Sequence, residues 1–205
     1  MKSDFWDKWA GLYDLSQRFN AHVYNEMIWE CFDQVNVGDK VLDAACGTGA
    51  VAVELSQKAQ NVVCLDLSTK MLKQTHAKAK KYEIDNLYFK TCDICRLPFK
   101  DACFDVTIAA NVLHLIDEPQ TVVRELCRVT KDGGKIILPT YLLGEASSGE
   151  RLLKLYKRFG FSAKRYWTLE QYAELIESFN LGECEFKFSD GKIPMGMAII
   201  KKGAV

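Results

Sequence analysis

The segment V-L-D-A-A-C-G-T-G, residues 41–49, decides the fold of this chain. It continues an apolar, strand-like run and precedes a helix-like run, Ala50–Gln60. A glycine turn between a strand and a helix lets a ligand approach the backbone closely, because no side chain stands in the way. Asp43 lies four residues before Gly47, the first glycine of this turn. A phosphate-binding turn has little use for a carboxylate there, whereas a ligand with an ammonium group does.

Composition places the chain among soluble globular proteins of one domain, with 205 residues, 48% of them hydrophobic and 26% charged. Lys plus Arg and Asp plus Glu both number 27, so the formal net charge is zero. This balance argues against a nucleic-acid partner held by bulk charge. No apolar run reaches the roughly 18 residues of a membrane span, and the first residues show no signal-peptide core. We therefore expect a cytoplasmic location.

Short apolar runs alternate with amphipathic helices through the middle of the chain. The predicted strands are 40–45, 61–67, 87–93, 104–111 and 135–142, the last after a turn at 132–134. The predicted helices are 50–60, 69–82 with Ser68 as N-cap, and a third that begins near Pro119. Such alternation predicts βαβ units, a parallel sheet and helices on both of its faces.

The two ends of the chain differ from this middle part. Residues 1–36 are rich in aromatic side chains and are predicted to be helical, whereas 183–189 and 195–201 are predicted to form an antiparallel hairpin. Helices are also expected at 151–159 and 168–179. We predict a single domain, 1–205, made of a helical lid (1–36), a cofactor-binding core (37–142), a helical cap (143–181) and a terminal hairpin (182–205).

Four polar residues stand at or near the carboxyl ends of four predicted strands: Asp43, Asp66, Asp93 and Asn111. In open α/β sheets, ligands bind outside these strand ends, near the point where the strand order reverses. The four residues therefore mark one edge of the sheet as the ligand site.

Seven motifs in order make the chain similar to the class I S-adenosylmethionine-dependent methyltransferases, in particular the UbiE-like or methyltransferase domain 11 type. They are F-W-D-K-W-A-x-x-Y-D (5–14), V-L-D-A-A-C-G-T-G (41–49), L-D-L-S-x-x-M-L (65–72), D-I-C-R-L-P-F (93–99), F-D-V (104–106), N-V-L-H-L-I-D-E-P (111–119) and D-G-G-K (132–135). The resemblance covers about residues 5–142. It implies an α/β, Rossmann-like, seven-stranded and mostly parallel sheet in the order 3-2-1-4-5-7-6, with the last strand antiparallel.

The resemblance also implies roles in holding S-adenosylmethionine. Asp43 would lie near the cationic amine, directly or through water, and Asp66 would accept both ribose hydroxyls. The backbone of the turn would hold the methionine end, through Ala45, Cys46, Gly47 and Gly49. The family often has glycine where this chain has Ala45, so the extra methyl group narrows the turn.

Further roles follow from the resemblance for the other end of the cofactor. Leu67 and Met71 would flank the adenine, Asp93 would take its amino group, and the Ile94 N–H would serve a ring nitrogen. Asn111 would close the pocket near the sulfonium through its backbone.

The implied reaction is methyl transfer to a small-molecule acceptor by in-line displacement, with release of S-adenosylhomocysteine. The acceptor pocket would lie between the N-terminal helices and the 144–167 insert. His114 and Tyr13 are the candidate catalytic residues, since an O- or N-nucleophile can need its proton removed. A lone histidine among apolar neighbours is, however, more often a structural residue. The oligomeric state, monomer or homodimer, is left open.

Two alternatives remain from the sequence. Residues 47–52 also fit G-x-G-x-x-A, and Asp66 lies 19 residues beyond Gly47, so an NAD(P)-binding enzyme is one of them. Asp43 and Asp93 argue against it, because a dinucleotide has no evident need for them. The other alternative is a non-catalytic scaffold or regulator that binds S-adenosylmethionine.

Two further patterns carry weaker hypotheses. Cys92 and Cys95 form a C-x-x-C pair, but no second pair or nearby histidine pair exists, so no metal site is predicted. A stretch of basic and aromatic residues between Lys154 and Trp167 is either a solvated face or a surface for an anionic or aromatic substrate, or RNA.

Overall fold

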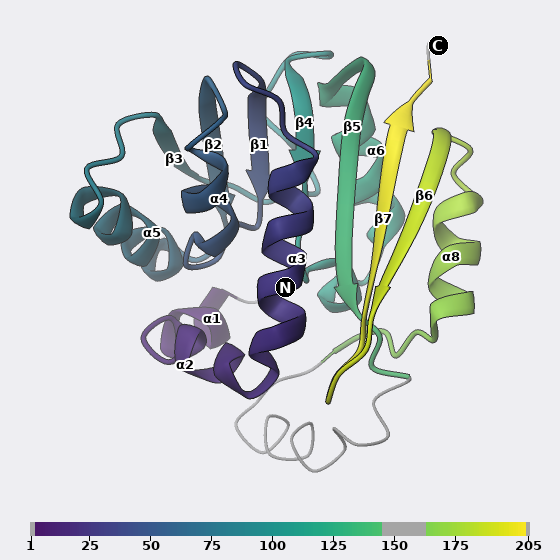
Figure 1. The fold of residues 1–205 in the computed structure, drawn as a ribbon, viewed down its shortest axis with the longest axis horizontal. Coiled ribbons are helices and arrows are strands. Elements are labelled where there is room, and N and C mark those ends of the chain that lie inside the picture. The colour runs from purple at the N-terminus through teal and green to yellow at the C-terminus, as the bar shows by residue number, and fades with distance from the viewer. Residues whose placement is uncertain (1–2, 145–162, 204–205) are drawn as a thin grey trace.

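The computed structural model describes residues 3–144 and 163–203. Seven strands form one sheet in the order β3-β2-β1-β4-β5-β7-β6 (Figure 1). Their bounds are Lys40–Ala44 (β1), Asn61–Asp66 (β2), Leu87–Thr91 (β3), Phe104–Ile108 (β4), Thr130–Tyr141 (β5), Gly182–Ser189 (β6) and Met195–Lys202 (β7). Strands β1 to β5 pair in parallel, and β7 runs antiparallel to β5 and β6. The predicted strand order, the antiparallel last strand and the terminal hairpin are confirmed.

The predicted turn at residues 132–134 is wrong. Residues 132–134 belong to β5, which begins at Thr130 instead of Lys135. The β4–β5 register shifts there, because Phe104 pairs with Thr130 while Val106 pairs with Lys135. The extra residues of β5 are accommodated by this irregularity, with Gly133 at a φ of 75°. A glycine pair thus serves a bulge in the strand and not a turn before it.

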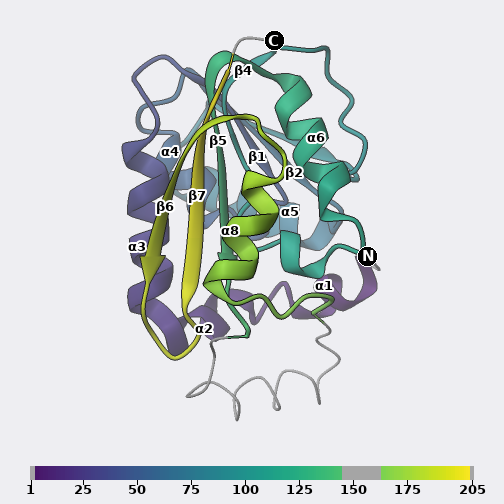
Figure 2. The same ribbon diagram turned by 90° about the vertical axis from the view of Figure 1, so that its right-hand side faces the viewer.

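Helices cover both faces of the sheet, as the alternation predicts (Figure 2). On one face lie α3 (Ala21–Asp33), α4 (Ala50–Leu55) and α5 (Thr69–Lys81), and on the other lie α6 (Pro119–Val129) and α8 (Leu169–Glu177). Helix α4 is shorter than the predicted 50–60, because the chain leaves the helix after Leu55 and turns toward β2. The predicted helix 151–159 lies outside the described residues.

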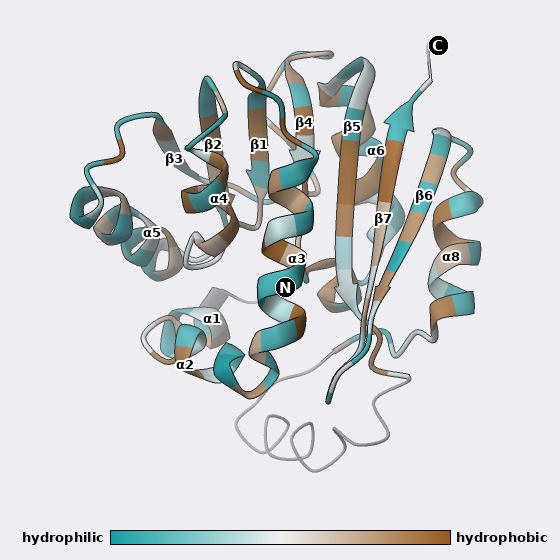
Figure 3. Cartoon of the chain, viewed as in Figure 1, coloured by the Kyte–Doolittle hydropathy of each residue, from teal (hydrophilic) through white to brown (hydrophobic). Residues whose placement is uncertain are grey.

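Local capping signals and burial define these elements. The Ser68 hydroxyl accepts a hydrogen bond from the Met71 N–H at 3.1 Å, so Ser68 is the N-cap of α5 as predicted. Thr168 and Gln171 form a capping box at the start of α8. Figure 3 shows the central strands largely hydrophobic and α5 largely hydrophilic on its visible side. None of the described helices has the length and hydropathy that crossing a membrane requires.

Three short helical segments lie at the carboxyl ends of the parallel strands (Figure 1): α1 (Ser3–Trp9), α2 (Tyr13–Gln17) and η1 (Arg18–Asn20). Two carboxylates tie them to the core. Asp7 accepts from the Ser68 hydroxyl at 2.5 Å. Asp14 accepts from the Thr48 hydroxyl at 2.5 Å and pairs with Lys78 at 2.7 Å. Both hydroxyls belong to loops that follow sheet strands, so the N-terminal helices close over this edge of the sheet.

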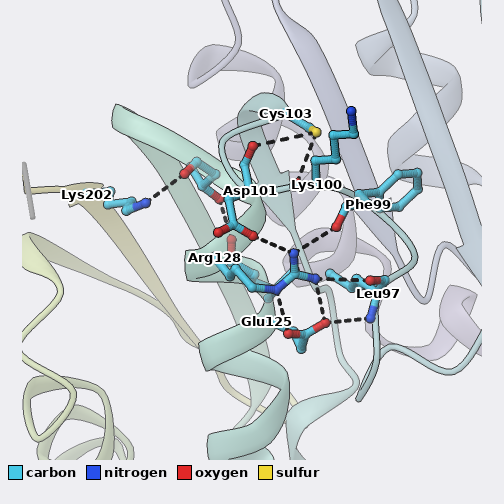
Figure 4. Close-up of polar contacts among 10 residues, drawn as sticks. Leu97, Phe99, Lys100, Asp101, Cys103, Glu125, Arg128 and Lys202 are labelled. Carbon is cyan, nitrogen blue, oxygen red and sulfur yellow. Dashed lines mark hydrogen bonds and ion pairs between the residues drawn. The ribbon is translucent and has the colours of Figure 1, made fainter.

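The Arg128 guanidinium organises the loop between β3 and β4 (Figure 4). It makes two hydrogen bonds to the Glu125 carboxylate, at 2.8 and 2.9 Å, and one to Asp101 at 2.8 Å. It also donates to the backbone carbonyls of Leu97, at 3.0 Å, and Phe99, at 2.8 Å. Because Arg128 sits on α6, these bonds fix the loop to a helix of the core.

Candidate functional site

The main cavity of the described structure opens at the carboxyl ends of the parallel strands and has a volume of about 310 Å³. It collects nine of the predicted site residues: Tyr13, Ala45, Gly47, Asp66, Leu67, Met71, Asp93, Ile94 and Asn111. They come from the loops that follow β1, β2, β3 and β4, from the end of β2, from α5 and from the N-terminal helices. The strand-end argument therefore locates the cavity correctly.

Asp66, the last residue of β2, joins two loops at the floor of this cavity. One carboxylate oxygen accepts from the Gly47 N–H at 2.9 Å and the other from the Ser68 N–H at 2.8 Å. Burial raises the pKa of Asp66, and these two backbone donors oppose the rise. A carboxylate has room for about four hydrogen bonds, so both oxygens keep capacity for a ligand.

Asp43, near the end of β1, is buried in a different way. It lines a small neighbouring cavity of about 30 Å³ and is 1% exposed, and neither carboxylate oxygen has a hydrogen-bond partner among the described residues. Burial, with a smaller contribution from the Asp66 charge, raises the pKa of Asp43 to about 7. The Ala52 N–H lowers the pKa of Asp43 and so opposes this rise, although neither carboxylate oxygen accepts a hydrogen bond from it. A buried carboxylate without a partner is costly, and a cationic ligand would offset that cost.

Asn111 follows β4 in the left-handed region, at a φ of 53°. Its N–H donates to the Pro139 carbonyl at 2.8 Å, and its side-chain Nδ2 donates to the Met27 sulfur at 3.5 Å. Its side-chain Oδ1 is buried and has no partner among the described residues. Asn111 lines the same small cavity as Asp43. Three unpaired acceptor oxygens, two from Asp43 and one from Asn111, therefore belong to residues that line one small cavity.

The glycine turn has three residues at positive φ: Ala45 at 65°, Gly47 at 56° and Gly49 at 80°. A Cβ atom at Gly49 would lie 2.2 Å from the Thr75 Cγ2 atom, so this glycine lets α4 start against α5. Gly49 lines neither the main nor the small cavity, whereas Cys46 lines the small one. Ala45 is strained, because its left-handed backbone conformation is unfavourable for alanine and freely adopted by glycine.

A second cavity of about 80 Å³ adjoins the main one, and the two share Trp6, Tyr13, Asn111 and Leu115. His114 lines only the second cavity, on the short helix η2 (Leu113–Leu115), and its Nδ1 atom lies 3.1 Å from the Thr140 hydroxyl. His114 is buried, and burial lowers its pKa to about 4. The two candidate catalytic residues thus differ in place, since Tyr13 lines both cavities and His114 only one.

Comparisons with known proteins agree with this geometry. The Methyltransferase domain family, Methyltransf_11, matches residues 42–138, which hold the glycine turn and every strand from β1 to most of β5. The demethylmenaquinone methyltransferase of Paenarthrobacter aurescens is 31% identical over 69% of this chain and 53% of its own length. Residues 42–138 thus match the Methyltransferase domain family, and the relatives support a class I S-adenosylmethionine-dependent methyltransferase.

Two other proteins show the range of this similarity. The 27-O-demethylrifamycin SV methyltransferase of Amycolatopsis mediterranei is 31% identical over 56% of this chain and 43% of its own length. The structure of phosphoethanolamine N-methyltransferase 2 from Haemonchus contortus, solved with S-adenosyl-L-methionine, matches with a TM-score of 0.71 and 18% identity, over 88% of this chain and 53% of that one. The chain spans about half the length of these curated relatives.

The loop after β3 forms a turn as well as part of the wall of the main cavity. The Asp93 carboxylate accepts from the Cys95 N–H at 3.0 Å, so Asp93 closes a turn, and it lines the main cavity too. Cys92 and Cys95 line the cavity beside it. Burial raises the pKa of both thiols, that of Cys95 to about 11. Within residues 3–144 and 163–203, no three His, Cys, Asp or Glu side chains gather as a metal ion requires.

The described end of the basic and aromatic stretch lies on the rim of the site. Lys164 pairs with Asp117 at 2.9 Å, and an Arg165 guanidinium N–H donates to the Asp117 carbonyl at 2.9 Å. The backbone N–H groups of Lys164 and Arg165 both donate to the His114 carbonyl, at 2.8 and 3.1 Å. The side chains of Lys164 and Arg165 therefore hold this segment to Asp117, and their backbone N–H groups hold it to His114 of η2. Residues 154–162 of the stretch lie outside the described structure.

Sequence reasoning missed several residues of the main cavity wall. They are Trp6, Cys92, Cys95, Ala110, Val112, Leu115, Ile116, Asp117, Glu118 and Thr121. Most lie one to eight residues from a predicted site residue, so proximity in the chain was the signal that could have found them. Trp6 also lies within this distance, because it is seven residues from Tyr13, and the two rings pack with centroids 6.1 Å apart.

Proposed function

We propose that this chain binds S-adenosylmethionine and transfers its methyl group to a small-molecule acceptor, with release of S-adenosylhomocysteine. The observation that carries the proposal is the group of three buried, unpaired oxygens of Asp43 and Asn111 around one small cavity. An α-ammonium group has three N–H donors and a positive charge, which suits these acceptors in number and in charge. The backbone of Ala45, Cys46 and Gly47 lines or adjoins the same space.

The main cavity fits the rest of the cofactor. Asp66 is proposed to accept the two ribose hydroxyls, with the acceptor capacity that its two backbone bonds leave. Leu67 and Met71 are proposed to flank the adenine, with Asp93 at its amino group and the Ile94 N–H at a ring nitrogen. All four residues line this one cavity, which supports the proposal.

S-adenosylmethionine supplies a methyl group already activated by its attachment to a positively charged sulfur. The lone pair of the acceptor atom forms the new bond to the methyl carbon as the carbon–sulfur bond breaks, and that electron pair stays on sulfur. Any proton on the acceptor atom passes to a base or to water. The task of the protein is alignment, which supplies several kcal/mol of rate enhancement. Trp6, Tyr13 and Asn111, which line both larger cavities, stand where that alignment is made.

His114 is proposed to orient the acceptor and not to serve as the general base. A general base works best with a pKa near the working pH, and the pKa of His114 is about 4. The ring is therefore a neutral hydrogen-bonding group at neutral pH. Tyr13 remains the candidate for proton transfer, since it lines both cavities.

The names of the relatives support a small-molecule acceptor. One is a methyltransferase of demethylrifamycin SV and another of demethylmenaquinone. The comparisons give no support to the NAD(P) alternative. We keep the cytoplasmic location and the choice between monomer and homodimer as predictions.

Calorimetric titration with S-adenosylhomocysteine and with NAD(H) tests the proposal. We expect the first to bind and the second not to bind. Asp66→Ala should weaken S-adenosylhomocysteine at least tenfold, whereas Asp85→Ala, at an exposed position, should leave its affinity unchanged. Circular dichroism shows whether Asp66→Ala still folds. If it does not, the comparison of S-adenosylhomocysteine with NAD(H) on the wild type still tests the proposal.

Binding of NAD(H), or of neither ligand, would overturn the proposed cofactor. Where S-adenosylhomocysteine binds, a screen of small acceptors with S-adenosylmethionine then separates an enzyme from a scaffold. Formation of S-adenosylhomocysteine with any acceptor supports the enzyme, and binding without turnover across the screen supports the scaffold.

A further inference from the structure

The second cavity has the position of an acceptor site and a chemistry of its own. It shares Trp6, Tyr13 and Asn111 with the main cavity, but neither Asp43 nor Asp66 lines it. None of the proposed ribose or adenine contacts reaches it. It therefore offers space next to the cofactor site and outside it.

Five of the thirteen described residues that line it are aromatic. Phe5, Trp6, Trp9 and Tyr13 come from the N-terminal helices, and Tyr141 comes from the end of β5. The rings of Phe5 and Trp6 pack edge to face with centroids 4.9 Å apart, and those of Trp6 and Tyr13 do so at 6.1 Å. Such arrays of rings favour a further flat ring in edge-to-face or offset contact.

The described wall of the second cavity holds no acidic, lysine or arginine side chain. Its one titratable ring other than tyrosine, His114, is kept neutral by burial. Several of its polar groups are already paired within the protein. Asn20 donates to the Ile193 carbonyl at 2.7 Å, and Tyr141 donates to the Gln17 side chain at 2.8 Å. A charged group placed there would find no counter-ion among the described side chains, and burying it would be unfavourable.

We propose that the second cavity takes the methyl acceptor and that the part of the acceptor it holds is an uncharged, flat and largely apolar group, such as an aromatic ring. This inference rests on the proposed function, because it assigns the cavity beside the cofactor to the acceptor. It separates the acceptor from phosphorylated, carboxylated and ammonium-bearing molecules, whose charge would find no counter-ion among the described residues of the wall. Trp9 and Tyr141 are then specificity residues, since they line this cavity and not the main one.

Three single-ring probes of similar size test the charge preference: phenol, benzoate and benzylammonium. Each is titrated by ligand-observed NMR at pH 7.5, with saturating S-adenosylhomocysteine and without it. We expect phenol to bind at least about tenfold more tightly than either charged probe. Trp9→Ala should weaken phenol about fivefold or more and leave S-adenosylhomocysteine affinity unchanged. Trp29→Ala, which removes a tryptophan that is 60% exposed on α3, is the matched control and should change neither affinity.

The proposal is overturned if benzoate or benzylammonium binds as tightly as phenol, if no probe binds, or if Trp9→Ala leaves phenol binding intact. Preference for benzylammonium would identify an aromatic cage for a cation instead. Absence of S-adenosylhomocysteine binding is a separate result, which overturns the proposed function. The titrations without that ligand still report on the cavity itself.

Discussion

The carboxylate of Asp43 makes the free protein less stable than it would be with a neutral group in the same place. Its pKa is raised from 3.8 to about 7, so the folded state holds a proton that the unfolded chain releases between these values. Where the folded state binds more protons, stability falls as pH rises. The loss runs from about pH 4 to about pH 7 and totals about 4 kcal/mol, at 1.36 kcal/mol for each pKa unit.

Asp43→Asn removes this ionisation, so the stability of the variant relative to the wild type should rise with pH. Between pH 5 and pH 8 the wild type loses about 3 kcal/mol through Asp43, which the variant does not lose. The fixed cost of burying the amide is the same at both pH values and cancels in this difference. His114 acts in the opposite sense, since its lowered pKa removes stability as pH falls from about 6.5 to about 4. That contribution is common to both proteins.

Urea denaturation of the wild type and of Asp43→Asn at pH 5 and pH 8, without ligand, measures the effect. The advantage of the variant should grow by about 3 kcal/mol from the lower to the higher pH. Asp85→Asn, at an exposed position, is the control and should show no such change. The same Asp43→Asn substitution should weaken S-adenosylhomocysteine binding. A pH-independent difference in stability would refute an uncompensated buried carboxylate at this position.

Two other substitutions test the support of the site, at Arg128 beside the β3–β4 loop and at Ala45 in the glycine turn. Arg128→Met leaves the carbonyls of Leu97 and Phe99 without their donor and should cost about 2–3 kcal/mol in urea denaturation, with weaker S-adenosylhomocysteine binding through the displaced loop. Arg124→Met, at an exposed position of the same helix, should cost far less, and equal losses would contradict the role of Arg128. Ala45→Gly should raise stability by about 0.5–1 kcal/mol, because it relieves the positive φ of Ala45, and a lower melting temperature would contradict it.

The parts of the fold that depend on short-range signals could be predicted from the sequence. Ser68 and Thr168 cap helices because a side-chain oxygen reaches an N–H only three residues away. The parallel core follows from the alternation of buried strands and helices, and the order of all seven strands from the family resemblance. Asp43, Asp66, Asp93 and Asn111 could be placed at one edge because every strand of a parallel sheet ends on the same side.

Long-range contacts could not be predicted in this way. The bond from Asp7 to Ser68 joins residues 61 positions apart, and that from Asp14 to Thr48 joins residues 34 apart. Both are single pairs without periodicity, so no pattern in the sequence announces them. The start of β5 was misplaced for a related reason. Gly133 suggests a turn locally, but pairing with β4 decides that the chain continues as an irregular strand.

The chemical state of the site residues depends on what surrounds them, and that is the least predictable quantity from sequence. Asp43 and Asp66 have the same side chain at similar strand ends, yet Asp66 accepts two backbone N–H groups and Asp43 accepts none from the described residues. Met27 and Tyr24 of α3 line the same small cavity as Asp43, and neither oxygen of Asp43 has a hydrogen-bond partner among the described residues. We propose that an ammonium group of the ligand supplies the missing donors and the opposite charge. Position in the sheet predicts that Asp43 lies at the ligand edge, whereas its enclosure depends on packing from a distant helix, which no local pattern announces.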